Sequence, residues 1–309
     1  MLIPLDGSEL AEVVFTYAQE LAGRLDLDVI LLLVVSPALR EFIPMHRAYI
    51  QQATETIRHQ VEEVQKRSGI QPGGKAIKVR GELTEGYPAE EILRYIDEDA
   101  ADLIIIATHG RSGIKRWTMG NVADKVLRAS KVPVLLVRAG VPDETVYDKW
   151  PKISLLVPLD GSEMAESVLP HIETLAKQRG PEPVNVTLLR TCEQPTIPSY
   201  YSPELSGVPL DWGKYMNQEI VMGKQVANEY LAGVEKRLKD IGIIVRSEVL
   251  VGKADDVIVD YANSNPFNLI VMATHGRSGL SRLVYGSVAA NLIHGVSIPI
   301  LLIKPEQSD

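Results

Sequence analysis

The sequence predicts an α/β protein made of two doubly wound, five-stranded parallel-sheet domains. One observation is an internal repeat: IPLDGSELAE at 3–12 returns as VPLDGSEMAE at 157–166, and ATHGRSG at 107–113 returns at 273–279. Another is that short apolar runs alternate with helical patterns within each copy. Alternating strands and helices, with strands that are apolar throughout, are typical of a parallel sheet covered by helices on both faces.

The spacing of the repeated segments predicts two domains, at 1–140 and 151–305. The offset between copies is 154 residues at the first landmark and 166 at the second, so the second copy carries an insertion of 12 residues. We place the insertion in 193–214, a segment rich in Pro, Ser, Gly and Tyr without periodicity, and predict a long loop there. The residues 139–151 are the expected linker. Two units of this size indicate domain duplication, since solenoids need about three or more small repeats.

The first copy reads as five strands and four helices. A short buried strand opens it, and Ser8 is a good N-cap for a helix with an apolar stripe at Leu10, Val14, Tyr17 and Leu21. Gly69 ends the second helix, and Pro88 suits the first turn of the third. The expected strands are 2–5, 29–35, 75–80, 102–108 and 133–137, and the expected helices begin at Ser8 and cover 46–68, 87–99 and 120–130. The second copy follows the same order.

Composition excludes several classes of protein. The net charge is −8, and each half contributes −4, from 18 basic and 22 acidic residues in 1–150 and 14 and 18 in 151–309. This acidic balance argues against a nucleic-acid partner, which needs a basic face. The single cysteine, Cys192, allows no intramolecular disulfide, and we expect it to be a small residue at a strand end. The longest apolar run, 29–35, is too short to span a membrane, and the first residues lack a signal-peptide pattern, so we expect a cytoplasmic protein.

Two loops are candidates for chemistry, because ligands of such sheets bind at the carboxyl ends of the strands. After the fourth strand, ATHGRSG is followed by Gly120 or Gly286 at a helix start. Glycines let a phosphate approach main-chain N–H groups, and a helix N-terminus adds about +0.5 charge. The alternative is that these glycines only shape a tight turn. After the first strand, Asp6 and Asp160 either accept hydrogen bonds from a base or ribose, or cap a turn.

These residues resemble the universal stress protein family, and the resemblance covers nearly the whole chain twice. Members of the family that bind ATP carry a glycine, two residues, a second glycine, nine residues and then Gly-Ser or Gly-Thr. Here the first glycine is Ala107 or Ala273, and the Ser/Thr is Ser287 in the second copy but Asn121 in the first. The second site is therefore the better match. The family also implies the strand order 3-2-1-4-5 and a contact through the fifth strands, which gives a pseudo-dimer within one chain and leaves room for a further homodimer.

By this similarity, ATP, ADP or AMP, with Mg²⁺ bridging the phosphates, occupies equivalent sites in the two copies. Base and ribose would lie near the first and second strands, and the phosphates near the glycine-rich loop. The implied residues of the second copy are Pro158, Leu159, Asp160, Thr191, Ala273, His275, Gly276, Arg277, Gly279, Gly286, Ser287 and Val288. Those of the first are Pro4, Leu5, Asp6, Val34, Ala107, His109, Gly110, Arg111, Gly113, Gly120, Asn121 and Val122.

The histidines, the basic residues and the aromatic residues of the insertion can each be explained without a ligand. His109 and His275 are compatible with backbone-bonded spacers in a turn, and neither has a partner at metal-ligand spacing, so we expect no protein metal site. The cluster of Arg111, Lys115, Arg116, Arg277 and Arg282 is compatible with solvated surface charge. Tyr200, Tyr201 and Trp212 of the insertion either pack within the loop or cover a pocket or partner surface.

Three functions fit the sequence. The first is a nucleotide-binding regulatory protein of the stress response. The second is a protein that keeps the fold, binds no nucleotide and acts through protein–protein contacts. The third is a slow ATPase or nucleotidyl transferase, which the sequence disfavours because it contains no P-loop, nucleophile elbow or HExxH motif. We therefore expect a protein without enzyme activity.

Overall fold

The computed structural model describes residues 1–70, 76–98, 101–108, 119–139, 153–178, 183–194, 212–275 and 285–305. The strands of the first half are β1 (Leu2–Leu5), β2 (Val29–Val35), β3 (Val79–Glu85), β4 (Ile104–Ala107) and β5 (Val134–Val137). Those of the second are β6 (Ile153–Pro158), β7 (Val184–Cys192), β8 (Ile244–Val251), β9 (Leu269–Ala273) and β10 (Ile300–Ile303).

The helices alternate with these strands. The first half has α1 (Glu9–Glu12), α2 (Phe15–Leu25), the 3₁₀ helix η1 (Pro37–Phe42), α3 (Ile43–Arg67), α4 (Pro88–Asp97) and α5 (Asn121–Ala129). The second has α6 (Glu163–Glu166), α7 (Leu169–Ala176), α9 (Trp212–Asp240), α10 (Ala254–Ser264) and α11 (Ser287–Gly295). Among the described residues, no helix combines the length and apolar character needed to cross a membrane.

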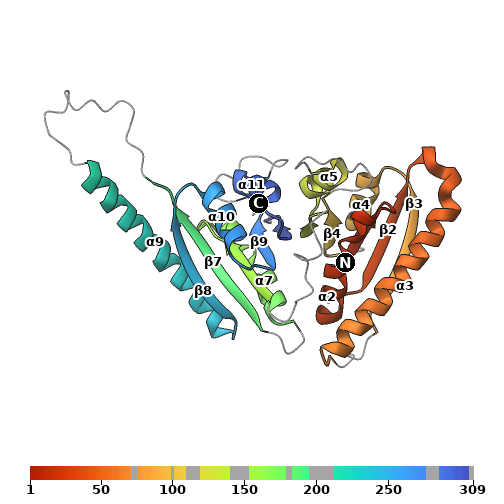
Figure 1. The fold of residues 1–309 in the computed structure, drawn as a ribbon, viewed down its shortest axis with the longest axis horizontal. Coiled ribbons are helices and arrows are strands. Elements are labelled where there is room, and N and C mark those ends of the chain that lie inside the picture. Colours follow the sequence, from red (N-terminus) through yellow and green to blue (C-terminus); the bar gives the residue numbers. More distant parts are fainter. Residues whose placement is uncertain are drawn as a thin grey trace.

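The ten described strands form one continuous sheet in the order β3-β2-β1-β4-β5-β10-β9-β6-β7-β8 (Figure 1). Within each half all pairs are parallel. The halves meet through β5 and β10, which pair antiparallel with Leu135 opposite Leu301. The fifth strands, which the resemblance implied as the contact, are therefore the junction of the molecule.

Helices cover both faces of the sheet, as the alternation predicted. One hydrophobic core contains side chains from α2, α3, α7 and α9, and the other contains side chains from α4, α5, α10 and α11. Neighbouring strand residues point to opposite cores: Leu31 joins the first and Leu32 the second. This alternation is the two-residue period of a strand, with both sides buried.

The first predicted helix is interrupted. Ser8 does cap α1, its Oγ accepting from Ala11 N at 3.3 Å. A tighter turn follows, in which Tyr17 N donates to Val14 O three residues before it, and α2 begins at Phe15. Val13 and Val14 keep right-handed helical angles, so Val14, Tyr17 and Leu21 of the apolar stripe still lie in the core.

The third predicted strand was misplaced. It was expected at 75–80, whereas β3 spans Val79–Glu85 and pairs with β2 from Val29 to Val35. The pairing with β2 determines where β3 begins. Because β3 lies at the edge of the sheet, polar residues such as Glu82 and Glu85 are tolerated in it.

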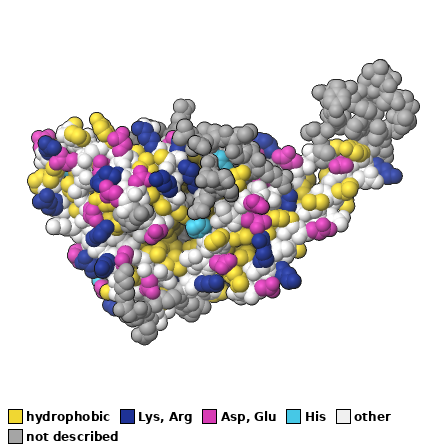
Figure 2. Space-filling view, turned by 180° about the vertical axis from the view of Figure 1, so that it is seen from behind, with side chains coloured by type: hydrophobic (Ala, Val, Ile, Leu, Met, Phe, Trp, Pro, Cys, Tyr) yellow, Lys and Arg dark blue, Asp and Glu magenta, His cyan; other side chains and the backbone are white. Residues whose placement is uncertain are grey.

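The predicted loop at 193–214 ends earlier than expected, because α9 already begins at Trp212. Residues 195–211, which include Tyr200 and Tyr201, lie outside the described residues, as do 140–150 of the linker. On the face shown in Figure 2, acidic and basic side chains are interspersed over the body of the molecule.

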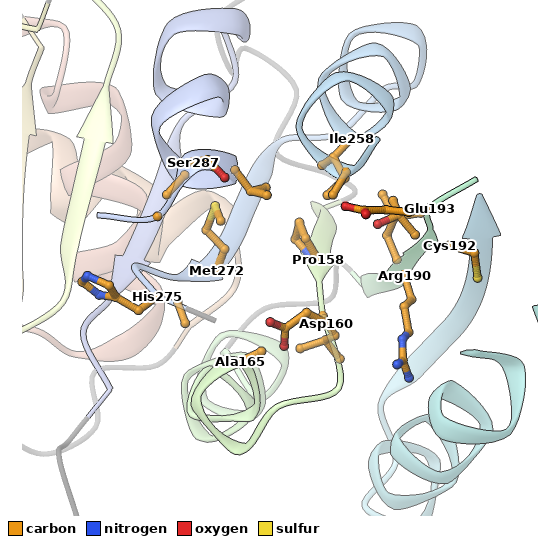
Figure 3. A pocket seen from close by; sticks show the side chains of 18 of the residues that line it. Pro158, Asp160, Ala165, Arg190, Cys192, Glu193, Ile258, Met272, His275 and Ser287 are labelled. Carbon is orange, nitrogen blue, oxygen red and sulfur yellow. The ribbon is translucent and has the colours of Figure 1, made fainter. Parts of the chain in front are cut away.

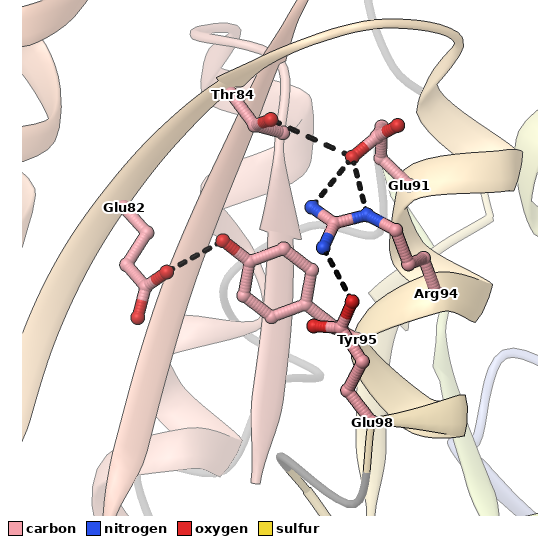
Figure 4. Close-up of polar contacts among 6 residues, drawn as sticks. All are labelled: Glu82, Thr84, Glu91, Arg94, Tyr95 and Glu98. Atoms are coloured by element: carbon pink, nitrogen blue, oxygen red, sulfur yellow. Dashed lines mark hydrogen bonds and ion pairs between the residues drawn. The ribbon is translucent and has the colours of Figure 1, made fainter.

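A polar network ties α4 to the edge strand β3 (Figure 4). Tyr95 Oη donates to Glu82 Oε2 at 2.5 Å. Arg94 pairs with Glu91 at 2.8 Å and with Glu98 at 2.7 Å, and its guanidinium lies 5.1 Å from the centre of the Tyr95 ring. This network fixes the helix that follows the carboxyl end of β3.

Burial, together with the hydrogen bond to Glu82, raises the pKa of Tyr95 to about 12, from about 10 in an unfolded chain. The folded protein thus holds this proton more tightly. The resulting stabilisation is complete below about pH 10 and is lost as the pH rises toward about 12. We expect the urea midpoint to fall more steeply between about pH 10 and pH 12 in the wild type than in Tyr95→Phe. Parallel curves for the two proteins would contradict this assignment.

Candidate functional site

A cavity of about 720 Å³ opens in the second half, at the carboxyl ends of β6, β7 and β9. The chain order reverses here, because β6 pairs with β7 on one side and with β9 on the other. Such a reversal leaves a crevice between the loops that follow the two strands. The cavity therefore lies where the sequence predicted a ligand.

Nine of the twelve residues predicted for this site line the cavity. They are Pro158, Leu159, Asp160, Thr191, Ala273, His275, Gly286, Ser287 and Val288. The other three, Gly276, Arg277 and Gly279, lie outside the described residues, as does Arg282.

One end of the cavity is apolar. Ile258 of α10 faces the space that Pro158 borders, whereas Met272 of β9 lies beside Ser287 in this view (Figure 3). Met222 and Val226 of α9 also line the cavity, and hydrophobic side chains lie along the arm that α9 forms (Figure 2). These two side chains are 62% and 58% exposed, so the wall that they form is open to solvent. A flat apolar group fits such a slot.

The opposite end is built from the start of α11. Gly286 is the N-cap of this helix, has no side chain to cap it, and its own N–H donates to Thr274 O at 2.8 Å. The N–H groups of the first turn are the ones that a helix leaves without backbone partners. Ser287 begins the helix and lines the cavity as well. The end beside α11 can therefore accept an anion.

The aspartates after the first strands act as turn residues in both halves. Asp160 Oδ1 accepts from Ser162 N at 2.9 Å and from Ser162 Oγ at 2.6 Å. Asp6 makes the same bonds to Ser8, at 3.0 and 2.6 Å. The capping role is thus real, and it fixes the Asp160 carboxylate in the cavity wall.

His275 makes a contact with a neighbouring side chain, whereas the sequence suggested a bond to the backbone. Its Nδ1 lies 3.0 Å from Oγ1 of Thr274, which is buried. The ring lies on the far side of the cavity from Arg190 and Cys192 (Figure 3). Cys192 ends β7, as expected of a small strand-end residue, and burial raises the pKa of its thiol. The thiol is therefore an apolar part of the wall.

Sequence reasoning missed the walls contributed by α9 and α10, and it missed Arg190. The strand registers make Arg190 the counterpart of Leu33, because Pro4 lies opposite Leu32 and Pro158 opposite Leu189. The Arg190 guanidinium stacks 4.7 Å from the centre of the Tyr230 ring of α9. The feature of the sequence that could have identified Arg190 is that the first copy has Leu33 at the equivalent position.

The predicted residues of the first half occupy matching places. Pro4 and Leu5 lie in β1, Val34 in β2 and Ala107 at the end of β4. Gly120 caps α5, with Asn121 and Val122 in its first turn, and Gly120 N donates to Thr108 O at 2.7 Å. The remaining predicted residues and the nearby basic cluster, namely His109, Gly110, Arg111, Gly113, Lys115 and Arg116, lie outside the described residues.

The sequence pattern of the universal stress protein family matches residues 1–138 and 154–304. The chain belongs to the universal stress protein family. A universal stress protein of Mycolicibacterium smegmatis is 21% identical over 308 residues, which is 99% of this chain and 97% of that protein.

A comparison over the full chain supports the fold. A universal stress protein from Archaeoglobus fulgidus shares the fold over 98% of this chain and 97% of its own, with a TM-score of 0.66 and 19% identity. An Arabidopsis thaliana family member with AMP bound covers 50% of this chain and 92% of its own, with 18% identity and a TM-score of 0.33.

Two glycines of the site differ in how they tolerate a side chain. Gly161 has φ +88°, and a Cβ there would lie 3.0 Å from the terminal nitrogens of Arg190. Gly286 has φ −63°, and among the described residues a Cβ would meet only Thr274 O, at 3.5 Å. We expect Gly161→Ala to lower the free energy of unfolding by about 1–2 kcal/mol and Gly286→Ala by less than about 1 kcal/mol. Urea denaturation of both variants measures this, and equal losses would contradict the assignment.

Proposed function

We propose that this universal stress protein binds an adenine nucleotide (ATP, ADP or AMP) in its second half and acts as a regulatory protein of the stress response. The observation that carries the proposal is a single cavity with an apolar slot at one end and an uncapped helix N-terminus at the other. A nucleotide has the same polarity, with a flat base at one end and phosphates at the other. The volume, about 720 Å³, lies within the range of small-molecule sites.

The base would lie between α9 and α10. Ile258 and Met222 offer apolar contacts to its faces, while Thr191 at the end of β7 supplies a polar group at the edge of the slot. The ribose would lie near Asp160, whose carboxylate the turn holds in place. This order along the cavity agrees with the roles that the family resemblance implies.

The phosphates would bind to the N–H groups of Ser287 and Val288 at the start of α11, with the Ser287 hydroxyl as a further donor. Among the described residues, no group of three or more His, Cys, Asp or Glu could hold a metal ion. Any Mg²⁺ would then enter with the phosphates, which with water supply most of its oxygen ligands.

We propose that binding occurs without chemical turnover. The one carboxylate that the turn fixes in the wall, Asp160, already accepts two hydrogen bonds from Ser162. A general base would need to reach a water beside the phosphates. An ATPase rate clearly above background that Asp160→Ala abolishes would contradict this proposal.

The first half supports a second candidate function, in which the copy keeps the fold and acts through protein contacts. Asn121 replaces Ser287 at the first position of the helix, and Leu33 replaces Arg190 in the second strand. These changes favour one binding half and one silent half.

Isothermal titration of the full chain with ATP and Mg²⁺ tests the proposal. We expect one site per chain with a dissociation constant below about 1 mM, which corresponds to about −4 kcal/mol. Flat titrations with ATP, ADP and AMP, on protein freed of bound small molecules, would exclude the nucleotide and favour the second candidate.

Gly286→Val should weaken ATP binding by more than about tenfold, equivalent to about 1.4 kcal/mol. The added methyl groups occupy the space through which a phosphate approaches the N–H groups, whereas the protein itself has room for a Cβ there. Gly120→Val is the matched control in the first half and should leave the measured affinity unchanged. Equal effects of the two substitutions would contradict the assignment to the second half.

A further inference from the structure

The residue before the candidate phosphate site is held by the opposite half of the molecule. Tyr285 precedes Gly286, and its hydroxyl donates to Oδ1 of Asp124 on α5 at 3.1 Å. The guanidinium of Arg128, one turn further along α5, lies 4.9 Å from the centre of the Tyr285 ring. Asp124 Oδ2 in turn accepts from Arg128 Nε at 2.8 Å. We call Asp124, Arg128 and Tyr285 the interdomain clamp.

The side chains of the interdomain clamp are partly shielded from solvent. The Asp124 and Arg128 side chains are only 30% and 34% exposed. Burial, with the nearby Asp124 carboxylate, raises the pKa of Tyr285, so its hydroxyl remains a donor at neutral pH. Partly buried hydrogen bonds to an ionised carboxylate are stronger than those between neutral groups.

Two further hydrogen bonds join the halves. Lys304 Nζ donates to Arg128 O of α5 at 3.3 Å, and Arg138, which follows β5, donates at 2.8 Å to O of Val296, at the C-terminal end of α11. The pairing of β5 with β10 runs beneath both contacts. Helices α5 and α11 lie on either side of this junction (Figure 1).

The start of α11 is thus held from two sides. Gly286 N donates to Thr274 O, which joins it to the end of β9 in its own half. The neighbouring Tyr285 is held by α5 of the first half. Because an anion site needs several N–H groups aimed at one point, the orientation of this first turn matters for affinity.

The reciprocal contact, from α11 to the residue before α5, cannot form with the same side chains. The repeat offset of 166 makes Met119, Ala290 and His294 the counterparts of Tyr285, Asp124 and Arg128. Met119 has no hydroxyl to donate and Ala290 has no acceptor. The first half thus supports the second site through a contact that the second half cannot return.

From these contacts we infer that Asp124 and Tyr285 are positioning residues through which the first half aligns the anion-binding N-terminus of α11 in the second. This inference rests on the proposed function for its effect on nucleotide affinity, but the alignment itself exists without a ligand. It also gives the first half a role that does not depend on a nucleotide of its own.

The binding experiment compares Tyr285→Phe, Asp124→Ala and the double variant, using ATP with Mg²⁺ as the probe. Each single substitution should raise the dissociation constant about fivefold, the effect of losing one hydrogen bond. The double variant should be no weaker than Asp124→Ala alone, because that substitution already removes the bond to Tyr285. Asp124→Asn keeps an acceptor oxygen and should bind ATP nearly as well as the wild type.

The matched control is Arg138→Ala, which removes a different hydrogen bond across the same junction. It should leave ATP affinity unchanged. Wild-type affinity in Tyr285→Phe and Asp124→Ala, additive losses in the double variant, or an equal loss in Arg138→Ala would each overturn the inference.

A ligand-free measurement separates this inference from the proposed function. The amides of Gly286 and Ala290, which donate to Thr274 O and Gly286 O, should exchange with deuterium at least about threefold faster in Tyr285→Phe than in the wild type. They should keep their wild-type rates in Arg138→Ala. If the wild type binds no nucleotide, the proposed function fails and this exchange experiment alone decides the inference; unchanged rates in Tyr285→Phe would overturn it.

Discussion

The antiparallel pairing of β5 with β10 is the constraint on which the rest of this structure depends. Each strand is only four residues long and lies at the edge of its own half. Unpaired edge strands leave a row of N–H and C=O groups exposed, and pairing two of them removes both edges at once. The result is one sheet of ten described strands instead of two separate sheets.

This junction also determines which parts of the halves meet. It brings α5 beside the start of α11, so that residues 161 positions apart in the chain share a hydrogen bond next to the cavity. A duplicated chain keeps this neighbour present at all times, since the partner domain is tethered and its effective concentration is high. The two copies were therefore free to acquire different roles, and the cavity is described in the second.

One difference between the copies lies in the second strand, close to the cavity. Their turns are the same, with Asp6 and Asp160 bonded to the following serine in almost identical geometry. The second strand differs instead, with Leu33 buried in one half and Arg190 stacked on Tyr230 in the other. The sheet and its turns are maintained by burial and local hydrogen bonds, whereas the residues around the cavity can vary without disturbing either core.

The sequence by itself determined the fold class, the duplication and most strands, because apolar runs buried on both faces leave a clear pattern. It also located nine cavity residues, since the loops after the first and fourth strands of each half follow recognisable motifs. Tertiary structure alone decided the start of β3, whose polar edge residues carry no such pattern and take their register from β2. It also decided the walls from α9 and α10 and the contact of Asp124 with Tyr285, because these join segments that only packing brings together.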